Sequence, residues 1–328
     1  MESNNGQGKS AMRPGTESVD FVIPHMGRPE MLAATIASVL AQTGVDRVAS
    51  ITVVTKNDSL LEIEPHEKLQ VIYAPEATSI SDQRNRGVLL GQAPLIAFLD
   101  ADIQLAENWL QTCTEELEQK PNRVLVSAMQ KQSANAGRVE RLRTALSNVS
   151  LDEAVQFLPG RNLLVKRSAN NAVGGFPEHL QTCEDYYYTE KLSRLGELYY
   201  TSRTDYIHLG EDKTLQQTFS KEIWRSEYNL RSLAGRTVPL REWPSILLPF
   251  WMLLAFIVLI TGFYAKVALV AGIIMLLLPA VLYSARLYLK PANGLPFHFL
   301  LLFYLVYFLA RAAGTVMGTR LMLTRTFA

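Results

Sequence analysis

The C-terminal third of this chain contains a long apolar stretch that is almost free of charge. From Ser245 to Ala285 the only charged residue is Lys266. A membrane-spanning helix needs about 20 consecutive, predominantly apolar residues, and the stretch holds two such segments, at about 246–263 and 267–285. We therefore expect a tight hairpin of two spanning helices with residues 264–266 at its tip. A buried helix pair in a soluble protein is the alternative, which the length and purity of the stretch disfavour.

A third apolar stretch, at about 296–318, is interrupted by Arg311. It is long enough to span a membrane with Arg311 facing protein, and it equally suits a re-entrant segment or a helix along the membrane interface. The sequence leaves these alternatives open. Residues 245–328 are thus expected to form a membrane region, and residues 213–244 an amphipathic interface helix with a linker.

Charge and composition predict the orientation. Basic residues flank the hairpin on both sides: Arg231, Arg236, Arg241, Arg286 and Lys290. The positive-inside rule places both flanks in the cytosol. Residues 1–17 are polar and lack the apolar core of a signal peptide, so we expect a disordered tail and a cytosolic domain at residues 18–212. The two cysteines, Cys113 and Cys183, suggest no disulfide framework and fit a reducing compartment.

Residues 18–212 alternate between strand and helix patterns. Strands are expected at 19–24, 50–55, 69–74, 95–99, 124–129 and 157–165, and helices at 29–44, 81–90, 107–119 and 184–195. This alternation is typical of an α/β domain with a mostly parallel sheet and helices on both faces. The polar and basic segment 133–150 is expected to be a long surface connection.

One predicted strand runs directly into two carboxylates. The apolar run Leu95–Leu99 reads as a strand buried on both faces, and Asp100, Asp102 and Gln104 follow it at every second position. Ligands bind beyond the carboxyl ends of such strands. Two carboxylates on one side of the chain suit a divalent cation that grips phosphate oxygens, with Gln104 as a third ligand. The alternative is an ordinary Asp-rich turn.

Four motifs occur in a specific order along this domain. They are Val22-Ile23-Pro24-His25-Met26-Gly27-Arg28-Pro29, then Arg84-Asn85-Arg86-Gly87, then Asp100-Ala101-Asp102, and last Gly174-Gly175-Phe176 followed by Glu184-Asp185. In this order they resemble the family-2 glycosyltransferases, whose GT-A fold is a Rossmann-like α/β domain. The resemblance covers roughly residues 19–231. It implies inverting transfer of a sugar from a nucleotide-sugar, a UDP- or GDP-sugar, with Mg²⁺ or Mn²⁺ on the diphosphate.

The resemblance also assigns roles to individual residues. Asp185 would be the catalytic base, with Glu184 next in line. The metal would be held by Asp100 and Asp102, with Gln104 and His208 assisting. The residues expected to bind substrate are Pro24, Arg28, Asp58, Arg84, Asn85, Asp100, Gly160, Trp224 and Arg225.

Each assignment has a structural alternative. Glu184 and Asp185 also suit plain helix capping, and Asp58 suits a turn. Arg84 and Asn85 suit a solvated helix face, and His208 suits a structural role. The segment with Trp224 and Arg225 suits an amphipathic interface helix.

The expected function follows from these features together. Processive family members carry Gln-x-x-Arg-Trp near the position of Trp224 and Arg225, and its absence favours addition of one sugar. We expect a multi-pass membrane enzyme that acts at the cytosolic face on a polyprenyl-phosphate type or other lipid-linked acceptor. Polysaccharide, glycolipid or cell-envelope biosynthesis would be its setting. The alternatives are a non-catalytic membrane subunit with a degenerate nucleotide-sugar-binding domain, which the intact acids oppose, and a transporter component. A net charge of +1 gives no argument for nucleic acid binding.

Overall fold

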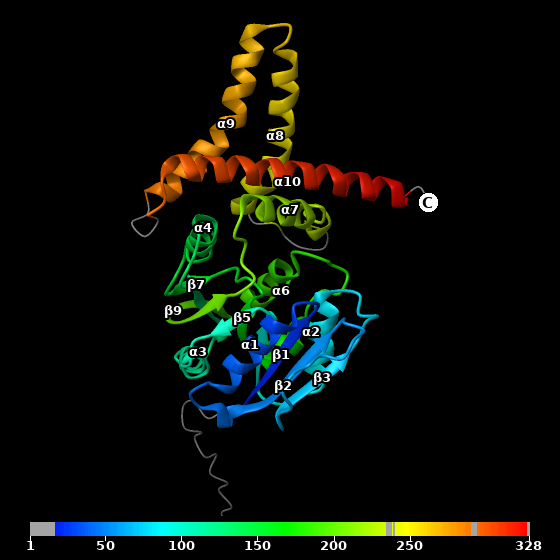
Figure 1. Cartoon of the computed structure of the whole chain (residues 1–328), viewed down its shortest axis with the longest axis vertical. Coiled ribbons are helices and arrows are strands. Elements are labelled where there is room, and N and C mark those ends of the chain that lie inside the picture. Colours follow the sequence, from blue (N-terminus) through cyan, green and yellow to red (C-terminus); the bar gives the residue numbers. More distant parts are fainter. Residues whose placement is uncertain (1–16, 234–237, 239, 290–293, 327–328) are drawn as a thin grey trace, which may run out of the picture.

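The computed structural model describes residues 17–233, 238, 240–289 and 294–326. The tail predicted at residues 1–17 lies almost entirely outside the described residues. Figure 1 shows an α/β domain at one end, a helical hairpin at the other, and two helices between them, α7 and α10. The strands are β1 (Val19–His25), β2 (Val48–Thr55), β3 (Leu69–Tyr73), β4 (Leu95–Leu99), β5 (Ile103–Leu105), β6 (Arg123–Lys131), β7 (Glu153–Val155), β8 (Asn162–Lys166) and β9 (Glu197–His208). The helices are α1 (Pro29–Leu40), α2 (Ile80–Leu89), α3 (Trp109–Glu118), α4 (Arg138–Ser147), α5 (Arg167–Val173), α6 (Glu184–Ser193), α7 (Leu215–Ser226), α8 (Trp243–Thr261), α9 (Lys266–Tyr288) and α10 (Phe297–Thr326).

The strands form one mixed sheet in the order β3-β2-β1-β4-β8-β6-β9-β5, with β7 paired to β9. The half built from β3, β2, β1 and β4 is parallel, as predicted. In the other half β6 and β9 are parallel, while β8 runs antiparallel to both β4 and β6. The sheet is therefore less uniformly parallel than the sequence suggested. Strand patterns predict that a segment is buried, but they do not specify its direction.

Helices cover both faces of the sheet, which confirms the predicted α/β class. On one face α1 and α3 contribute Leu32, Ile36 and Leu110 to a core with β1 and β4. On the other face α2 and α6 contribute Val88 and Leu192 to a second core. Strand β4 is buried along its whole length because it faces both cores.

The parallel half of the sheet determines where a site can form. Because β1, β2 and β4 run in one direction, their carboxyl ends lie at the same edge. The residues that follow them, among them Lys56 and Asp100, therefore meet there.

The segment 133–150 differs from its prediction as a surface connection. It contains α4, whose Leu142 is fully buried in a third core formed with α8, α9 and α10. Val139, Leu142 and Leu146 recur at helical spacing within the basic segment. Helix α4 thus attaches the α/β domain to the C-terminal helices.

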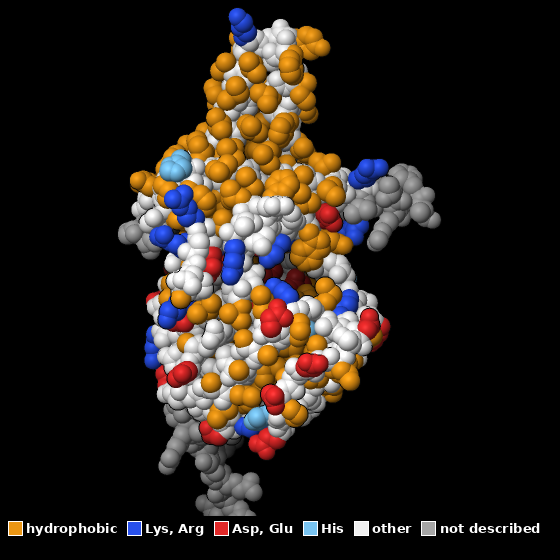
Figure 2. All heavy atoms as spheres, viewed as in Figure 1, with side chains coloured by type: hydrophobic (Ala, Val, Ile, Leu, Met, Phe, Trp, Pro, Cys, Tyr) orange, Lys and Arg blue, Asp and Glu red, His pale blue; other side chains and the backbone are white. Residues whose placement is uncertain are grey.

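Three C-terminal helices are long and apolar enough to cross a membrane: Trp243–Thr261, Lys266–Tyr288 and Phe297–Arg320. The first two form the predicted hairpin, and their backbones approach so closely that a side chain at Gly272 would collide with the backbone of Leu259. Hydrophobic side chains cover the hairpin (Figure 2).

Helix α10 runs across the base of this hairpin instead of alongside it, with α7 packed beneath (Figure 1). A side chain at Gly314 or Gly318 would strike the backbone of α7 or of the residue after it, at Ile223 and Glu227 respectively. Small residues on α10 therefore permit its close contact with α7.

Candidate active site

A cavity of about 860 Å³ lies between the carboxyl edge of the sheet and the C-terminal helices. Its walls come from the loops after β1, β2, β4 and β9, from the start of α6, and from α7, α8 and α10. Figure 2 shows the hollow beneath the apolar band, with basic side chains at its mouth and acidic ones inside. One cavity thus joins the α/β domain to the apolar helices.

The end of the cavity nearest the sheet contains Asp100, Asp102 and His208. Asp102 Oδ1 lies 3.4 Å from His208 Nε2, and Asp102 Oδ2 pairs with Arg28 Nη2 at 3.0 Å. Burial alone would raise the pKa of Asp102, but the hydrogen bond and charge of His208, together with Arg28, outweigh it and lower that pKa. A side chain at Gly210 would occupy the space of the Arg28–Asp102 pair. Asp102 is therefore held as an anion beside an imidazole.

Asp100 sits in a different environment. Its Oδ1 pairs with Arg84 Nη2 at 2.8 Å, but burial raises its pKa despite that guanidinium, and the negative charge of Asp102 adds to the rise. Asp100 therefore carries less stabilisation of its negative charge than Asp102 does.

Asp102 and His208 have side-chain atoms at the spacing of two ligands of one divalent metal ion. Adjacent ligands of an octahedral ion with bonds of about 2.1 Å lie about 3 Å apart, close to the spacing of Asp102 Oδ1 and His208 Nε2. Glu211 Oε2 lies 3.2 Å from His208 Nδ1, the arrangement in which a carboxylate orients a metal-binding imidazole. Within the described ranges, no group of three or more His, Cys, Asp or Glu is placed to hold a metal. Asp102 and His208 could supply two ligands to an ion such as Mg²⁺ or Mn²⁺, whose remaining ligands would be phosphate oxygens.

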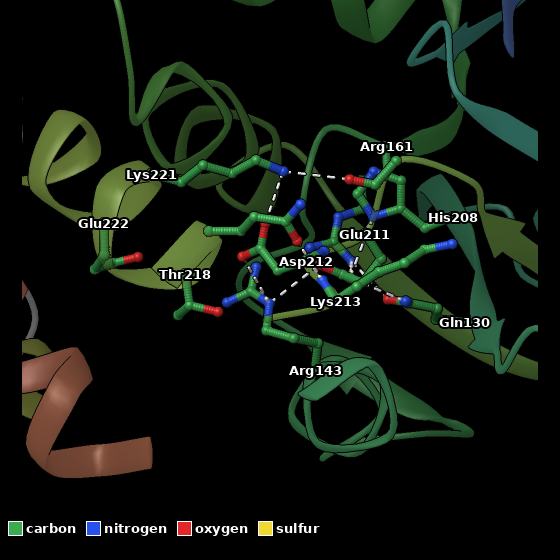
Figure 3. Close-up of polar contacts among 12 residues, drawn as sticks. Gln130, Arg143, Arg161, His208, Glu211, Asp212, Lys213, Thr218, Lys221 and Glu222 are labelled. Carbon is green, nitrogen blue, oxygen red and sulfur yellow. Dashed lines mark hydrogen bonds and ion pairs between the residues drawn. The ribbon is translucent and has the colours of Figure 1, made fainter. Parts of the chain in front are cut away.

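Glu211 belongs to a buried network that connects His208 to α4 and α7 (Figure 3). Glu211 Oε1 pairs with Arg143 Nε of α4 at 3.2 Å, and Glu211 Oε2 lies 3.6 Å from Arg161 Nη1. Asp212 pairs with Lys221 Nζ of α7 at 2.7 Å. Burial would raise the pKa of Glu211, but His208 and the two arginines lower it far more, so the carboxylate stays ionised.

The start of α6 places Glu184 and Asp185 in the middle of the cavity. Neither is the N-cap residue, which is Cys183 in a left-handed conformation with φ 63°. Asp185 Oδ1 accepts from the backbone N–H of Tyr186 at 2.9 Å, and Oδ2 accepts from that of Gly160 at 3.4 Å. Burial, followed by the charge of Glu184, raises the pKa of Asp185 to about 7. Asp185 therefore has the proton affinity of a general base at neutral pH.

Arg84 connects the two acidic groups. Its side chain is 1% exposed and pairs with Asp100 at 2.8 Å and with Glu184 at 2.9 Å. Its Nη2 also donates to the carbonyl of Gly160 at 3.2 Å, where an added Cβ would be 3.0 Å from the guanidinium. Arg84 forms an ion pair with Glu184, and Asp185 is the acid that faces the cavity without an ion-pair partner among the described residues.

Residues 20–174 match the family model described as glycosyl transferase family 2. This part of the chain, somewhat less than half of it, is similar to that family. A search of curated protein sequences found no match. The family-2 domain and the helices after it are similar in structure to the mannosyltransferase PcManGT from Pyrobaculum calidifontis, determined in complex with GDP-Man and Mn²⁺. That similarity has a TM-score of 0.61 at 15% identity and covers 94% of this chain and 90% of the other. It establishes a shared fold, the predicted GT-A fold.

Two further solved structures are more distant. S. aureus TarS matches with a TM-score of 0.48 at 13% identity, over 72% of this chain and 47% of that one. GalNAc-T7 with UDP, GalNAc and Mn²⁺ matches with a TM-score of 0.49 at 14% identity, over 71% of this chain and 54% of that one.

Most of the residues predicted for the site line the cavity. They are Pro24, Arg28, Arg84, Asp100, Asp102, Gly160, Glu184, Asp185, His208, Trp224 and Arg225. The structure thus brings together residues that span two hundred positions of the chain and that the family resemblance had linked only by their order.

Three predicted residues lie outside the cavity of the family-2 domain. Gln104 is exposed on β5, because the chain turns at residues 101–102 and the alternation that began in β4 does not continue. Asp58 is exposed in the loop after β2, and Lys56 is the residue of that loop that lines the cavity. The Asn85 amide bonds the backbone of Phe176 and the carboxylate of Glu178, so it supports the Gly-Gly-Phe turn.

Other cavity residues were not predicted. Lys56, Arg161 and Arg311 line it, and Glu211 supports it through His208. The sequence carried a signal for Arg311, the only Lys, Arg, Asp or Glu between Phe297 and Thr319. Lys56, Arg161 and Glu211 had no signal, because only the folded sheet brings their loops together.

Proposed function

We propose that this chain is a membrane-anchored, inverting glycosyltransferase that moves one sugar from a nucleotide-sugar to a lipid-linked acceptor. The observation that carries the proposal is the single cavity. It contains the Asp100–Asp102–His208 group, the acid Asp185, and side chains of the apolar helices α8 and α10. The cavity could therefore hold the donor, the catalytic base and a lipid acceptor together.

The donor would bind at the sheet end. Asp102 and His208, with Asp100 beside them, would hold Mg²⁺ or Mn²⁺, which as a Lewis acid would neutralise charge on the leaving nucleoside diphosphate. The complex of the similarly folded PcManGT with GDP-Man and Mn²⁺ supports this assignment. Lys56, Arg28 and Arg161 also line the cavity and would bind the anionic donor.

Asp185 would act on the acceptor side. Its carboxylate takes the proton of the acceptor hydroxyl while that oxygen forms the new bond to the anomeric carbon, and the nucleoside diphosphate leaves from the opposite face. One displacement of this kind inverts the configuration. A pKa of about 7 suits the proton transfer at neutral pH.

The C-terminal helices would present a lipid acceptor. The α8–α9 hairpin is long enough to cross a bilayer, since a 19-residue helix is about 28 Å long. We place α10 in the plane of the interface, because it crosses the base of the hairpin and packs on α7. The cytosolic face would hold the α/β domain, in keeping with the basic residues that flank the hairpin. Polysaccharide, glycolipid or cell-envelope synthesis would use such an activity.

The metal assignment predicts a specific loss. Asp102→Ala removes a hard oxygen ligand, so nucleoside diphosphate release from a panel of nucleotide-sugars should fall close to the level seen with a chelator. Gln104→Ala is the matched control, because Gln104 lies two residues on and outside the cavity. The measurement is nucleoside diphosphate release by the purified full chain, titrated with Mg²⁺ and Mn²⁺. Full activity in chelator, or equal effects of the two variants, would contradict the assignment.

A further inference from the structure

The membrane end of the cavity has a charge arrangement that the donor site does not use. Glu222 of α7 is 3% exposed and lies between two arginines. Its Oε2 is 3.4 Å from Arg225 Nη1, and its Oε1 is 3.4 Å from Arg311 Nη1. Both arginines line the cavity, which Glu242 also borders. One carboxylate at these long distances leaves two guanidiniums incompletely satisfied.

Helix α10 adds unsatisfied donors at the same place. Arg311 Nε is buried and has no hydrogen-bond partner among the described residues, and the same holds for Thr315 Oγ1. The two residues are one turn apart, so they share a face of α10, and both line the cavity. Thr315 is 2% exposed. Buried donors without partners are rare in folded proteins and call for an explanation.

An arginine inside an apolar helix is rare and commonly marks a functional site. The other contacts of Arg311 are long as well, 3.3 Å to the Tyr307 hydroxyl and 3.4 Å to the Ser245 carbonyl. Arg225 also lies close to the segment that contains Asp185, since Thr182 Oγ1, three residues before Asp185, donates to the Arg225 carbonyl at 3.2 Å.

We propose that Arg225, Arg311 and Thr315 form a subsite for a phosphate group of the lipid acceptor. A phosphate has the oxygens to accept from both guanidiniums and from the hydroxyl, and Arg is the side chain best suited to grip it. The subsite holds the acceptor at the membrane end of the cavity while its reacting hydroxyl reaches Asp185. This proposal rests on the proposed function, because only that function makes the lipid an acceptor. The binding it describes does not require turnover.

The test measures lipid binding without any donor. The full chain in detergent micelles is titrated with a polyprenyl phosphate and with the matching uncharged polyprenol. Wild type should bind the phosphate more tightly. Arg311→Gln should weaken that binding about tenfold to a hundredfold, the usual effect of losing a charge-assisted hydrogen bond. Thr315→Val should weaken it less, and Arg320→Gln, an exposed arginine of the same helix, should leave it unchanged.

Glu222→Gln separates a ligand subsite from a structural ion pair, and it also covers the case in which Arg311→Gln fails to fold. Removing the carboxylate that competes with phosphate should tighten binding of the polyprenyl phosphate. A purely structural pair predicts a lower melting temperature and no gain in affinity, which would overturn the proposal. Equal binding of phosphate and polyprenol would do the same. Equal competition by phosphatidic acid would overturn the assignment to the acceptor, since any phospholipid would then fill the site.

Nucleotide-sugar affinity is measured on the same variants and should not change. Loss of donor binding in wild type would count against the proposed function and leave the phosphate subsite standing. Intact donor binding with no preference for the phosphate lipid would overturn the phosphate subsite and leave the proposed function standing.

Discussion

Asp185 and Glu184 are adjacent acids with different surroundings. Arg84 pairs with Glu184 at 2.9 Å, while Asp185 faces the cavity and has a pKa raised to about 7 by burial and by Glu184. If Asp185 accepts the proton, only its ionised form is active. The transfer rate at saturating donor should therefore rise as the pH rises through about 7.

Glu184→Gln provides a check on that assignment. It removes the negative charge that helps raise the pKa of Asp185, so the rate profile should move to lower pH. The measurement is the rate constant for transfer against pH in both proteins. A profile that stays flat through neutrality, or moves to higher pH, would contradict the role of Asp185.

Asp185→Asn tests the same residue without a pH series. Transfer should fall by about 10²–10⁴, the usual contribution of a positioned base, while nucleotide-sugar affinity persists. The folded-state pKa of Asp185 lies above its unfolded value, so its ionised form costs stability at neutral pH. The neutral amide should therefore not lower the melting temperature. A capping role predicts the reverse, a loss of about 1 kcal/mol with near-normal turnover. Asp58→Asn, an exposed acid outside the cavity, is the control.

At the residue scale, the motifs of the sequence are far apart along the chain, and the structure brings several of them to one cavity. The order of the motifs placed Asp100, Asp102 and Asp185 in one cavity. Gln104 failed because its prediction assumed that one strand continued, whereas the chain turns at residues 101–102. Glu211 could not be found, because its contact with His208 depends on how β9 ends.

At the scale of elements, the sequence left open whether α10 spans the membrane, re-enters it or lies along the interface. Its apolar composition resembles that of α8 and α9, so length and hydropathy give all three the same prediction. The structure separates them, because α10 packs across the hairpin base and against α7. Tertiary packing decided the direction of α10, and no local pattern encodes it. Helix α4 was also missed, because its charged residues outnumber the apolar residues at helical spacing, among them the buried Leu142.

The position of α10 can be measured. Leu302 and Met317 are both about half exposed and lie 15 residues apart on similar faces of the helix. Spin labels at these two sites, with Cys113→Ala and Cys183→Ala as background, should report nearly the same shallow depth in bilayers. A label at Ile257 of α8 is the control and should lie deep. If α10 spans, the two α10 labels should differ in depth by about 22 Å, which would contradict an interface helix.

At the scale of the whole molecule, neither half contains the complete cavity. The α/β domain supplies the acids and the loops that would bind a nucleotide-sugar, and α7, α8 and α10 supply the wall on the side of the apolar helices. The network from His208 through Glu211 and Asp212 to α4 and α7 joins the halves (Figure 3). Donor and acceptor would therefore meet only in the intact chain at a membrane.

The most direct test is product analysis with the full chain reconstituted in vesicles. The protein is given a panel of nucleotide-sugars with Mg²⁺ or Mn²⁺ and phosphate-bearing polyprenyl lipids, with and without a sugar hydroxyl to accept transfer. The lipid product is then examined by mass spectrometry and NMR. We predict that one donor yields a lipid with a single added sugar whose anomeric configuration is opposite to that of the donor. Retained configuration, several added sugars, or no transfer by protein that binds a nucleotide-sugar would contradict the account.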